Sequence, residues 1–266
     1  MTNTRKTARV ASLAVAALLP TAGRAAADPV PAAPVAVAYV AYAAALPVLR
    51  LHASYAIGPA DYEVKLAFDT AGVFGALVHA HVDSVASGTL SDGRARPSRY
   101  YAAGTLRGQP HVTRIEYPAG EPRVEQLAPP VEQDNEPVSA AQQAGTIDSL
   151  SAMAELVSSV ARTGRCDGTQ RTFDGRRLSE LSARTVGEES LAPTGRSTFS
   201  GRALRCDLEG RQIAGFAKGA DPATVGRPLH GSAWFASLAP GTPAVPVRIS
   251  FETRFFGTAT AYLVAK

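Results

Sequence analysis

Residues 62–68 read Tyr-Glu-Val-Lys-Leu-Ala-Phe, and this stretch decides the fold class. Large apolar side chains stand at every second position, with Glu63, Lys65 and Ala67 between them. A period of two is typical of a strand that has one buried face and one solvated face. We therefore predict a half-buried strand here, in a sheet that covers an apolar core.

The pattern continues on both sides of this strand. A short strand is expected at 53–57, Asp-Thr-Ala-Gly at 69–72 is typical of a turn, and residues 73–85 resume as a strand, which together predict an antiparallel hairpin. Further strand-like runs lie at 112–117, 123–127, 170–173, 177–185, 197–208, 232–237, 245–253 and 255–263. Many short strands with Gly, Pro or Asp at the joints favour a mainly β fold, an antiparallel curved sheet forming an open barrel or a sandwich.

One amphipathic helix interrupts the strands. Its apolar face has helical spacing and consists of Leu150, Met153, Ala154, Val157, Val160 and Ala161. Thr146 or Asp148 can cap its start, and Gly164 is expected to end it. We expect the apolar face to pack against the sheet; insertion into a partner's groove is the alternative.

The first 27 residues have the pattern of a secretory signal peptide. Arg5, Lys6 and Arg9 precede an apolar run at 10–19, and Ala-Ala-Ala at 25–27 precedes Asp28. The run has about half the length that a transmembrane helix needs, although a membrane anchor or a buried helix is the alternative. We predict Sec export to the periplasm with cleavage after Ala27, and no membrane-spanning segment after cleavage.

This segment also accounts for the charge of the chain. The sequence has 27 Lys and Arg against 23 Asp and Glu, and residues 1–27 hold four of the basic residues and no acidic one. Removing the segment leaves 27 − 4 = 23 basic against 23 acidic groups. A net charge of zero removes the main electrostatic support for nucleic-acid or anionic-membrane binding.

The remainder is expected to be one domain at 39–266, with two independent domains on either side of residues 129–144 as the alternative. Residues 28–38 are rich in Pro and Ala and predict a flexible leader. Residues 129–144 contain three prolines and several acidic residues, which predicts a long surface loop.

Cys166 and Cys206 are the only cysteines in the chain. An even number of cysteines in an exported chain favours a disulfide, while a metal pair or a redox dithiol is the alternative. Closing a loop of this length would stabilise the fold by about 4 kcal/mol in the chain-entropy model.

Two groups of polar residues are candidates for a site. Asp174-Gly175 predicts a tight type I′ turn, and Arg176 and Arg177 after it offer forked donors for a carboxylate or phosphate. Both arginines are therefore candidate ligand-binding residues, although solvated arginines beside a turn are the plainer interpretation. His79, His81 and Asp83 alternate, so one face of a strand could present a metal site, or only the wet side of a hairpin.

The sequence offers no support for other chemistries. It has no nucleophile elbow around Ser232, and no phosphate-binding, dinucleotide-binding or zinc-protease motif. We therefore expect no catalytic residue and no cofactor.

Several stretches of the chain together form a recognisable pattern: Gly145 to Ala152, Cys166, Phe173 to Leu178, Gly201 to Cys206, Pro246 to Arg248 and Ala261 to Leu263. They resemble exported proteobacterial proteins of the domain of unknown function 3108 family, and residues 53–92 and 117–130 resemble that family's N-terminal half. The resemblance covers about residues 39–266. It implies an exported, mostly β protein with no established activity and no catalytic residues to carry over. By analogy of fold alone, it suggests the curved-sheet carriers that move lipoproteins or lipids across the periplasm.

The expected function is therefore non-catalytic binding of an apolar ligand, such as a lipid, or of a partner at the cell envelope. A structural or interaction factor without a ligand is one alternative. A metal-dependent hydrolase built on His79, His81 and Asp83 is another.

Overall fold

The computed structural model of the protein describes residues 1–2, 33–254 and 257–265, and its main feature is one sheet of 13 strands. The first seven are β1 Val35–Ala43, β2 Leu46–Ile57, β3 Asp61–Thr70, β4 Ala80–Ser91, β5 Arg94–Leu106, β6 Gln109–Glu116 and β7 Arg123–Ala128. The other six are β8 Gly168–Phe173, β9 Leu178–Leu191, β10 Gly201–Ala214, β11 Leu229–Ala236, β12 Val245–Thr253 and β13 Gly257–Ala265.

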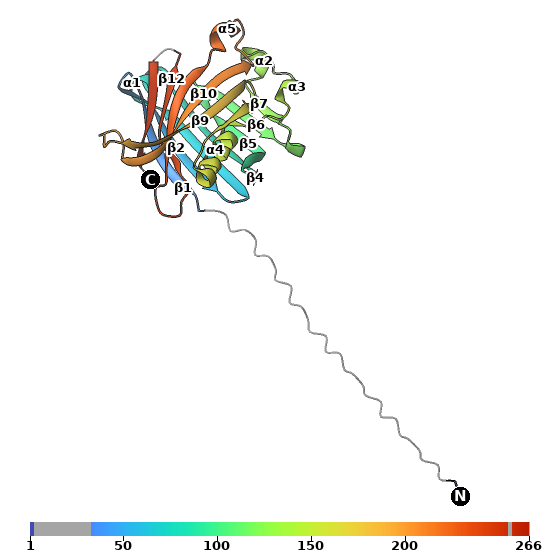
Figure 1. Ribbon diagram of the computed structural model, residues 1–266. Helices are drawn as coiled ribbons and strands as arrows, with labels where there is room; N and C mark the ends of the chain where they lie inside the picture. The colour runs from blue at the N-terminus through green and yellow to red at the C-terminus, as the bar shows by residue number, and fades with distance from the viewer. Residues whose placement is uncertain (3–32, 255–256, 266) are drawn as a thin grey trace. The chain divides into compact units, whose positions relative to one another are not determined.

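The strand order shows that the sheet consists of two meanders joined edge to edge. It runs β7-β6-β5-β4-β3-β2-β1-β13-β12-β11-β10-β9-β8, and every neighbouring pair is antiparallel. Consecutive strands are neighbours throughout, except β7 and β8, which lie at opposite edges of the sheet. The two meanders are joined where β1 pairs with β13. This confirms the predicted mainly β, antiparallel architecture (Figure 1).

Short helices occupy the connections. They are α1 Gly72–Leu77, the 3-10 turn η1 Pro118–Gly120, α2 Val131–Asp134, α3 Ala140–Gln143, α4 Ser149–Thr163 and α5 Pro222–Val225. The segment with α2, α3 and α4 links β7, at one edge of the sheet, to β8, at the other edge.

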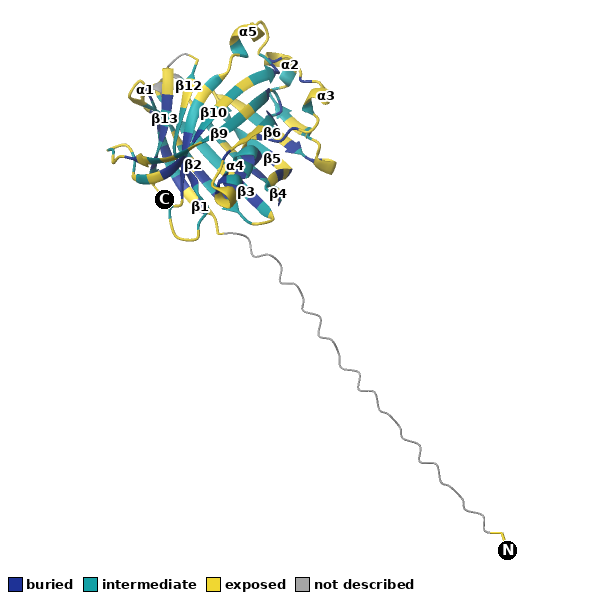
Figure 2. Cartoon of the chain, viewed as in Figure 1, coloured by how far each residue is buried: buried dark blue, intermediate teal, exposed yellow. Residues whose placement is uncertain are grey.

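α4 is the predicted amphipathic helix, and its ends follow from its sequence. The side chain of Asp148 accepts a hydrogen bond from the backbone N–H of Ser151 at 2.8 Å, which caps the first turn. Gly164 ends the helix in the left-handed conformation, with φ of 66°, that favours glycine. The helix packs against β2, β3, β4 and β5 and also reaches β8. Buried residues gather on α4 and the strands beside it (Figure 2).

Four buried tyrosines fill the space between α4 and the first meander: Tyr39, Tyr55, Tyr62 and Tyr100. The hydroxyl of Tyr62 donates to Ser151 Oγ at 2.7 Å, and Ser151 Oγ in turn donates to the Asp148 carboxylate at 2.5 Å. The hydroxyl of Tyr39 donates to the carbonyl of Pro246 on β12 at 2.7 Å. The bond from Tyr62 fixes α4 to β3, and the bond from Tyr39 joins β1 to β12. Together they satisfy buried hydroxyl groups of this core.

The tip of the β8–β9 hairpin brings the two edges of the sheet together. A Cβ added to Gly175 would lie 2.9 Å from Thr113 Cγ2 on β6 and 3.3 Å from Leu127 Cδ1 on β7. The guanidinium of Arg176 donates to the carbonyl of Pro129, just after β7. Nearby, Asn135 Nδ2 donates to the carbonyl of Gly215 at 2.9 Å. Contacts at the tip of the β8–β9 hairpin thus connect the β8 edge of the sheet to the β7 edge.

Several details differ from the sequence-based expectations. β5 at Arg94–Leu106 was not among the predicted strands. Residues 72–77 form α1 rather than the start of a strand, because a short apolar run does not distinguish helix from strand by periodicity. The expected leader at 28–38 overlaps β1, which begins at Val35 because Val35 and Val37 are buried. The expected loop at 129–144 contains α2 and α3. Asp174 has no positive φ, so the turn is not type I′; its carboxylate accepts from the N–H groups of Arg176 and Arg177 instead.

The expected signal peptide at 1–27 lies almost entirely outside the described residues. Within the described ranges, no helix is both long and apolar enough to cross a membrane.

Candidate functional site

A cavity of about 650 Å³ lies between α4 and the inner face of the second meander. Its apolar lining comes from β9 to β12 and from α4: Leu181, Ala183, Leu208, Leu229, Ile249 and Phe251 on the strands, and Ala152, Met153 and Leu156 on the helix. α4 thus uses one face against the first meander and presents another face to this space.

The register of the strands explains why there is a hollow. Ala183 on β9 pairs with Leu208 on β10, and Leu208 pairs with Gly231 on β11. One step along the cavity, Leu181 pairs with Gly210, which in turn pairs with Leu229. Each row across the floor therefore contains a residue with little or no side chain. The larger residues beside it form apolar walls instead of filling the centre.

Two large apolar side chains of this cavity are exposed. Leu181 is 36% exposed and Phe251 is 39% exposed. Both residues line the cavity. Exposed apolar side chains grouped in a concave site are typical of ligand sites, whereas scattered ones are normal on any surface.

Glu155 holds the helical wall of the cavity in place. Its carboxylate accepts from the backbone N–H of Ala95 at 2.8 Å, from Arg94 Nη1 at 3.1 Å and from Gln170 Nε2 at 2.6 Å. These partners belong to β5 and β8. α4 is thereby tied to both meanders across the mouth of the cavity.

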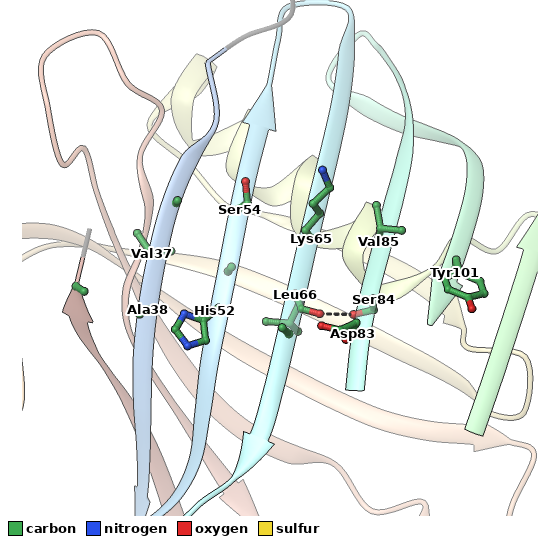
Figure 3. A pocket seen from close by; sticks show the side chains of 14 residues that line it. Val37, Ala38, His52, Ser54, Lys65, Leu66, Asp83, Ser84, Val85 and Tyr101 are labelled. Atoms are coloured by element: carbon green, nitrogen blue, oxygen red, sulfur yellow. Dashed lines mark hydrogen bonds between the residues drawn. The ribbon is translucent and has the colours of Figure 1, made fainter. Parts of the chain in front are cut away.

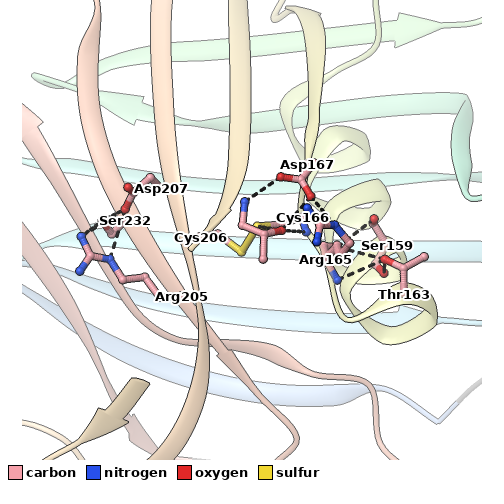
Figure 4. The surroundings of a disulfide bond; sticks show 10 residues. Ser159, Thr163, Arg165, Cys166, Asp167, Arg205, Cys206, Asp207 and Ser232 are labelled. Atoms are coloured by element: carbon pink, nitrogen blue, oxygen red, sulfur yellow. Dashed lines mark hydrogen bonds and ion pairs between the residues drawn. A yellow bond between two sulfur atoms is a disulfide. The ribbon is translucent and has the colours of Figure 1, made fainter. Parts of the chain in front are cut away.

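A disulfide between Cys166 and Cys206 lies beside the cavity, and Cys166 is part of the cavity's lining (Figure 4). It joins the chain just after α4 to the middle of β10, with a Cα–Cα distance of 6.3 Å. The backbone N–H of Cys166 donates to Thr185 Oγ1 at 2.9 Å, and Asp167 accepts from the backbone N–H of Thr185 at 2.9 Å. The C-terminal end of α4 is therefore fixed at a set separation from the second meander.

One end of the cavity is polar. Arg177 and Ser179 line it, together with Gln212, which pairs with Ser179 across the strands. Residues 177, 179, 181 and 183 all line the cavity, so its wall changes from polar to apolar along β9. Over six residues of strand this change spans roughly 20 Å.

The structure separates the two arginines that the sequence singles out. Arg177 lines the cavity and is exposed. Arg176 is partly buried, points to the carbonyl of Pro129 and does not line this cavity. Burial lowers the pKa of Arg176 below the ordinary arginine value. Arg176 therefore bridges the edges of the sheet, and only Arg177 is placed to meet a ligand in the cavity.

The outer face of the second meander is charged where the inner face is apolar. Asp207 receives hydrogen bonds from Arg184 at 2.9 Å, from Arg205 at 3.2 Å and from Ser232 Oγ at 3.0 Å, as Figure 4 shows in part. The sheet therefore has a solvated surface on one side and the cavity on the other.

His79 and His81 form no cluster around a common centre. His81 lies between two carboxylates, with Nδ1 2.7 Å from Asp69 and Nε2 2.9 Å from Asp83. Hydrogen bonds to these carboxylates raise the pKa of His81 above its ordinary value. His79 precedes the strand. Within the described ranges, no three His, Cys, Asp or Glu residues are arranged to hold a metal ion.

A second hollow, of about 630 Å³, lies against the first meander (Figure 3). Its lining comes mainly from β1 to β4, with Tyr101 of β5 and Ala265 of β13. Most of these residues are small, and His52, Lys65, Asp83 and Tyr101 are the larger polar ones. No α-helix lines this groove, whereas α4 forms one wall of the first cavity.

Sequence reasoning found Arg177 but not the apolar residues of the cavity. Leu181, Leu208 and Phe251 lie on three strands, and only the pairing register places them on one face. The glycines 210 and 231 were the one available signal, since glycine inside a strand often marks a site of close approach or open space.

These features define a class: a curved antiparallel β protein whose central helix leaves an apolar cavity on one side. The model of the family described as "Protein of unknown function (DUF3108)" matches residues 44–264. The chain belongs to this family, which confirms the resemblance seen in the sequence.

Solved structures are similar in fold, and one of them is a beta-barrel-like protein. The crystal structure of a beta-barrel-like protein of domain of unknown function DUF1849, from Brucella abortus, aligns with a TM-score of 0.50 and 12% identity. The alignment covers 89% of this chain and 98% of that one. At this identity the similarity concerns the fold alone. No match was found among curated proteins.

Proposed function

We propose that this protein binds an apolar ligand, such as the acyl chain of a lipid, in the cavity between α4 and the second meander, without a covalent step. The observation that carries the proposal is the pair Leu181 and Phe251, large apolar side chains that remain exposed inside a concave site. A ligand that covered them would remove their apolar surface from water.

The free energy available from such burial limits the complex to reversible binding. Each methylene that leaves water contributes about 0.8 kcal/mol. An acyl segment of about eight methylenes would gain roughly 6 kcal/mol before the costs of ordering and association. The result is an exchangeable complex, as a carrier requires.

We place this activity in the bacterial periplasm. The signal-peptide pattern of residues 1–27 and the disulfide both support an oxidising compartment outside the cytoplasm. The disulfide would also serve the site, because it fixes the helical wall relative to the floor.

Native mass spectrometry of the protein purified from a Gram-negative periplasm tests the proposal, with and without extraction by organic solvent. We expect an added mass that extraction removes and that fragments as a lipid. Ala183→Trp, which fills the cavity floor, should lose the added mass. Ser190→Trp is the matched control, because Ser190 lies on β9, is exposed and does not line the cavity. A wild-type protein without added mass would contradict the proposal.

A further inference from the structure

The polar end of the cavity contains the one lining arginine that has no protein acceptor among the described residues. Five arginines line the cavity: Arg94, Arg162, Arg177, Arg211 and Arg254. Arg94 pairs with Glu155 and Arg211 with Glu180, while Arg162 and Arg254 donate to backbone carbonyls. Within the described ranges, the guanidinium of Arg177 has neither a hydrogen bond nor an ion pair.

The hydroxyl beside Arg177 is also unengaged. Ser179 follows Arg177 by two residues, so its side chain emerges on the same side of the strand. Among the described residues, the hydroxyl of Ser179 has no hydrogen-bond partner. One guanidinium and one hydroxyl, both able to donate, therefore remain free at the same end of the cavity.

The acidic side chains of the lining do not cancel this positive charge. Glu155 accepts a hydrogen bond from the backbone N–H of Ala95, and Asp167 accepts one from the backbone N–H of Thr185. Glu252 accepts one from the backbone N–H of His230. Glu209 lies 3.7 Å from His230. Asp92 is the remaining acidic residue of the lining, and its backbone carbonyl accepts from Arg162, which places it beside that arginine. Within the described ranges, no carboxylate of the lining pairs with Arg177, so this cation is unpaired at the polar end of the cavity.

From this arrangement we infer that the ligand of the cavity is an amphiphile with a single anionic headgroup, which Arg177 and Ser179 bind while the chain lies along Leu181 and Ala183. The inference rests on the proposed function and specifies its ligand. A guanidinium binds carboxylates and phosphates in the same forked geometry, so a fatty-acid carboxylate and a lipid phosphate share this chemistry.

Isothermal titration calorimetry with three probes tests the inference: dodecanoate and dodecyl phosphate, each below its critical micelle concentration, and dodecanol below its solubility limit. Both anions should bind wild-type protein more tightly than the alcohol does. The ratio of dodecanoate to dodecyl phosphate affinity then shows which headgroup the site prefers. High salt should weaken binding of the anions and leave the alcohol unchanged.

Arg177→Gln should weaken binding of the anions by about tenfold or more, the loss expected for one charged hydrogen-bonded contact, and should change dodecanol binding less than about twofold. Arg107→Gln is the matched control, because Arg107 is exposed in the β5–β6 turn, remote from the lining. Arg177→Lys should restore part of the affinity for the anions.

The two ways of failing are distinct. If none of the three probes binds wild-type protein, the proposed function is wrong. If dodecanol binds as tightly as the anions, or if Arg177→Gln leaves all three affinities unchanged, the cavity binds apolar chains but the inference about the headgroup is overturned. The affinities of wild-type protein for the three probes, and their dependence on salt, test the inference even if Arg177→Gln does not fold.

Discussion

The first and second meanders have the same topology and differ in what their inner faces carry. Along β1 to β5 the inner face presents large aromatic side chains, such as Tyr55 and Tyr100, which are buried against α4 and its surroundings. Along β9 to β11 the corresponding rows contain Ala183, Gly210 and Gly231. The first meander thus packs closely against α4, whereas the part of the second meander around Leu181 and Phe251 forms the wall of a cavity. Elsewhere the second meander adds buried side chains such as Phe173 and Phe235 to the core.

The comparison shows that a curved antiparallel sheet does not by itself decide between core and ligand site. Side-chain volume along a few rows decides it, because interiors are packed to nearly uniform density and any deficit in volume remains as space. The same helix serves both halves, since one face packs and the other faces the cavity. Each prediction below is designed to break or to sharpen this contrast.

The largest effect should come from truncating one aromatic residue in each half. Tyr55→Ala should lower the free energy of unfolding by about 3–5 kcal/mol, because the tyrosine is only 5% exposed and its removal leaves a cavity. Phe251→Ala should cost less than about 1 kcal/mol, because Phe251 already contacts solvent. Urea unfolding of both variants measures the difference. Equal losses would mean that the second half is a packed core as well.

The disulfide should contribute nearly as much. Replacing both Cys166 and Cys206 with alanine should destabilise the protein by about 2–5 kcal/mol, since the closed loop is 40 residues long. Wild-type protein in reductant should unfold at the same urea concentration as the double variant. A loss below about 1 kcal/mol would show that α4 is held to the second half by other contacts alone.

Asp148 should give a smaller, pH-dependent effect in the packed half. Burial raises the pKa of this carboxyl above its ordinary value, so the folded state holds the proton more tightly than the unfolded state does. Stability should therefore fall as the pH rises from the ordinary carboxyl pKa through the raised folded pKa.

The variant Asp148→Asn should lack this dependence, because asparagine caps the helix without titrating. Unfolding free energies of both proteins between about pH 4 and 7 provide the test. Asp148→Ala, as the control for the cap, should be about 1–2 kcal/mol less stable than Asp148→Asn at every pH, because neither side chain titrates. Wild-type stability that rises relative to Asp148→Asn over this range would contradict the assignment.

The smallest effect is expected at the polar end of the cavity. Arg177→Gln should change the free energy of unfolding by less than about 0.5 kcal/mol, because Arg177 is exposed and has no partner in the described parts of the chain. Arg176→Gln should cost more, since it removes the contact with Pro129 between the edges. Thermal unfolding of the two variants in parallel separates them. A larger loss of stability for Arg177→Gln than for Arg176→Gln would show that the roles of the two arginines are exchanged.

The sequence was sufficient for the fold class, for α4 and for most strands, because those features depend on local periodicity and capping. The period-two pattern at 62–68 and the Asp148 and Gly164 caps each act within a few residues. The run at 73–77 was mistaken for a strand, because its apolar residues fit either period.

The cavity could not be predicted in the same way. A one-residue change of register would turn Leu181 and Leu208 to the outer face, and nothing local fixes that register. Arg176 and Arg177 show the same limit, since they are adjacent in sequence yet have different surroundings. Which of the two faces the cavity depends on the hairpin tip, where the Asp174 carboxylate accepts from both backbone N–H groups.

The most direct test of the central claim is an NMR titration of protein with labelled leucine and valine methyl groups, using dodecanol as the probe. We predict that Leu181, Leu208 and Leu229 shift, because they line the cavity. Leu150 and Leu263, which are buried elsewhere, and Val85, which lines the groove of Figure 3, should keep their positions. Shifts confined to Val85, or no shifts at all, would contradict the account.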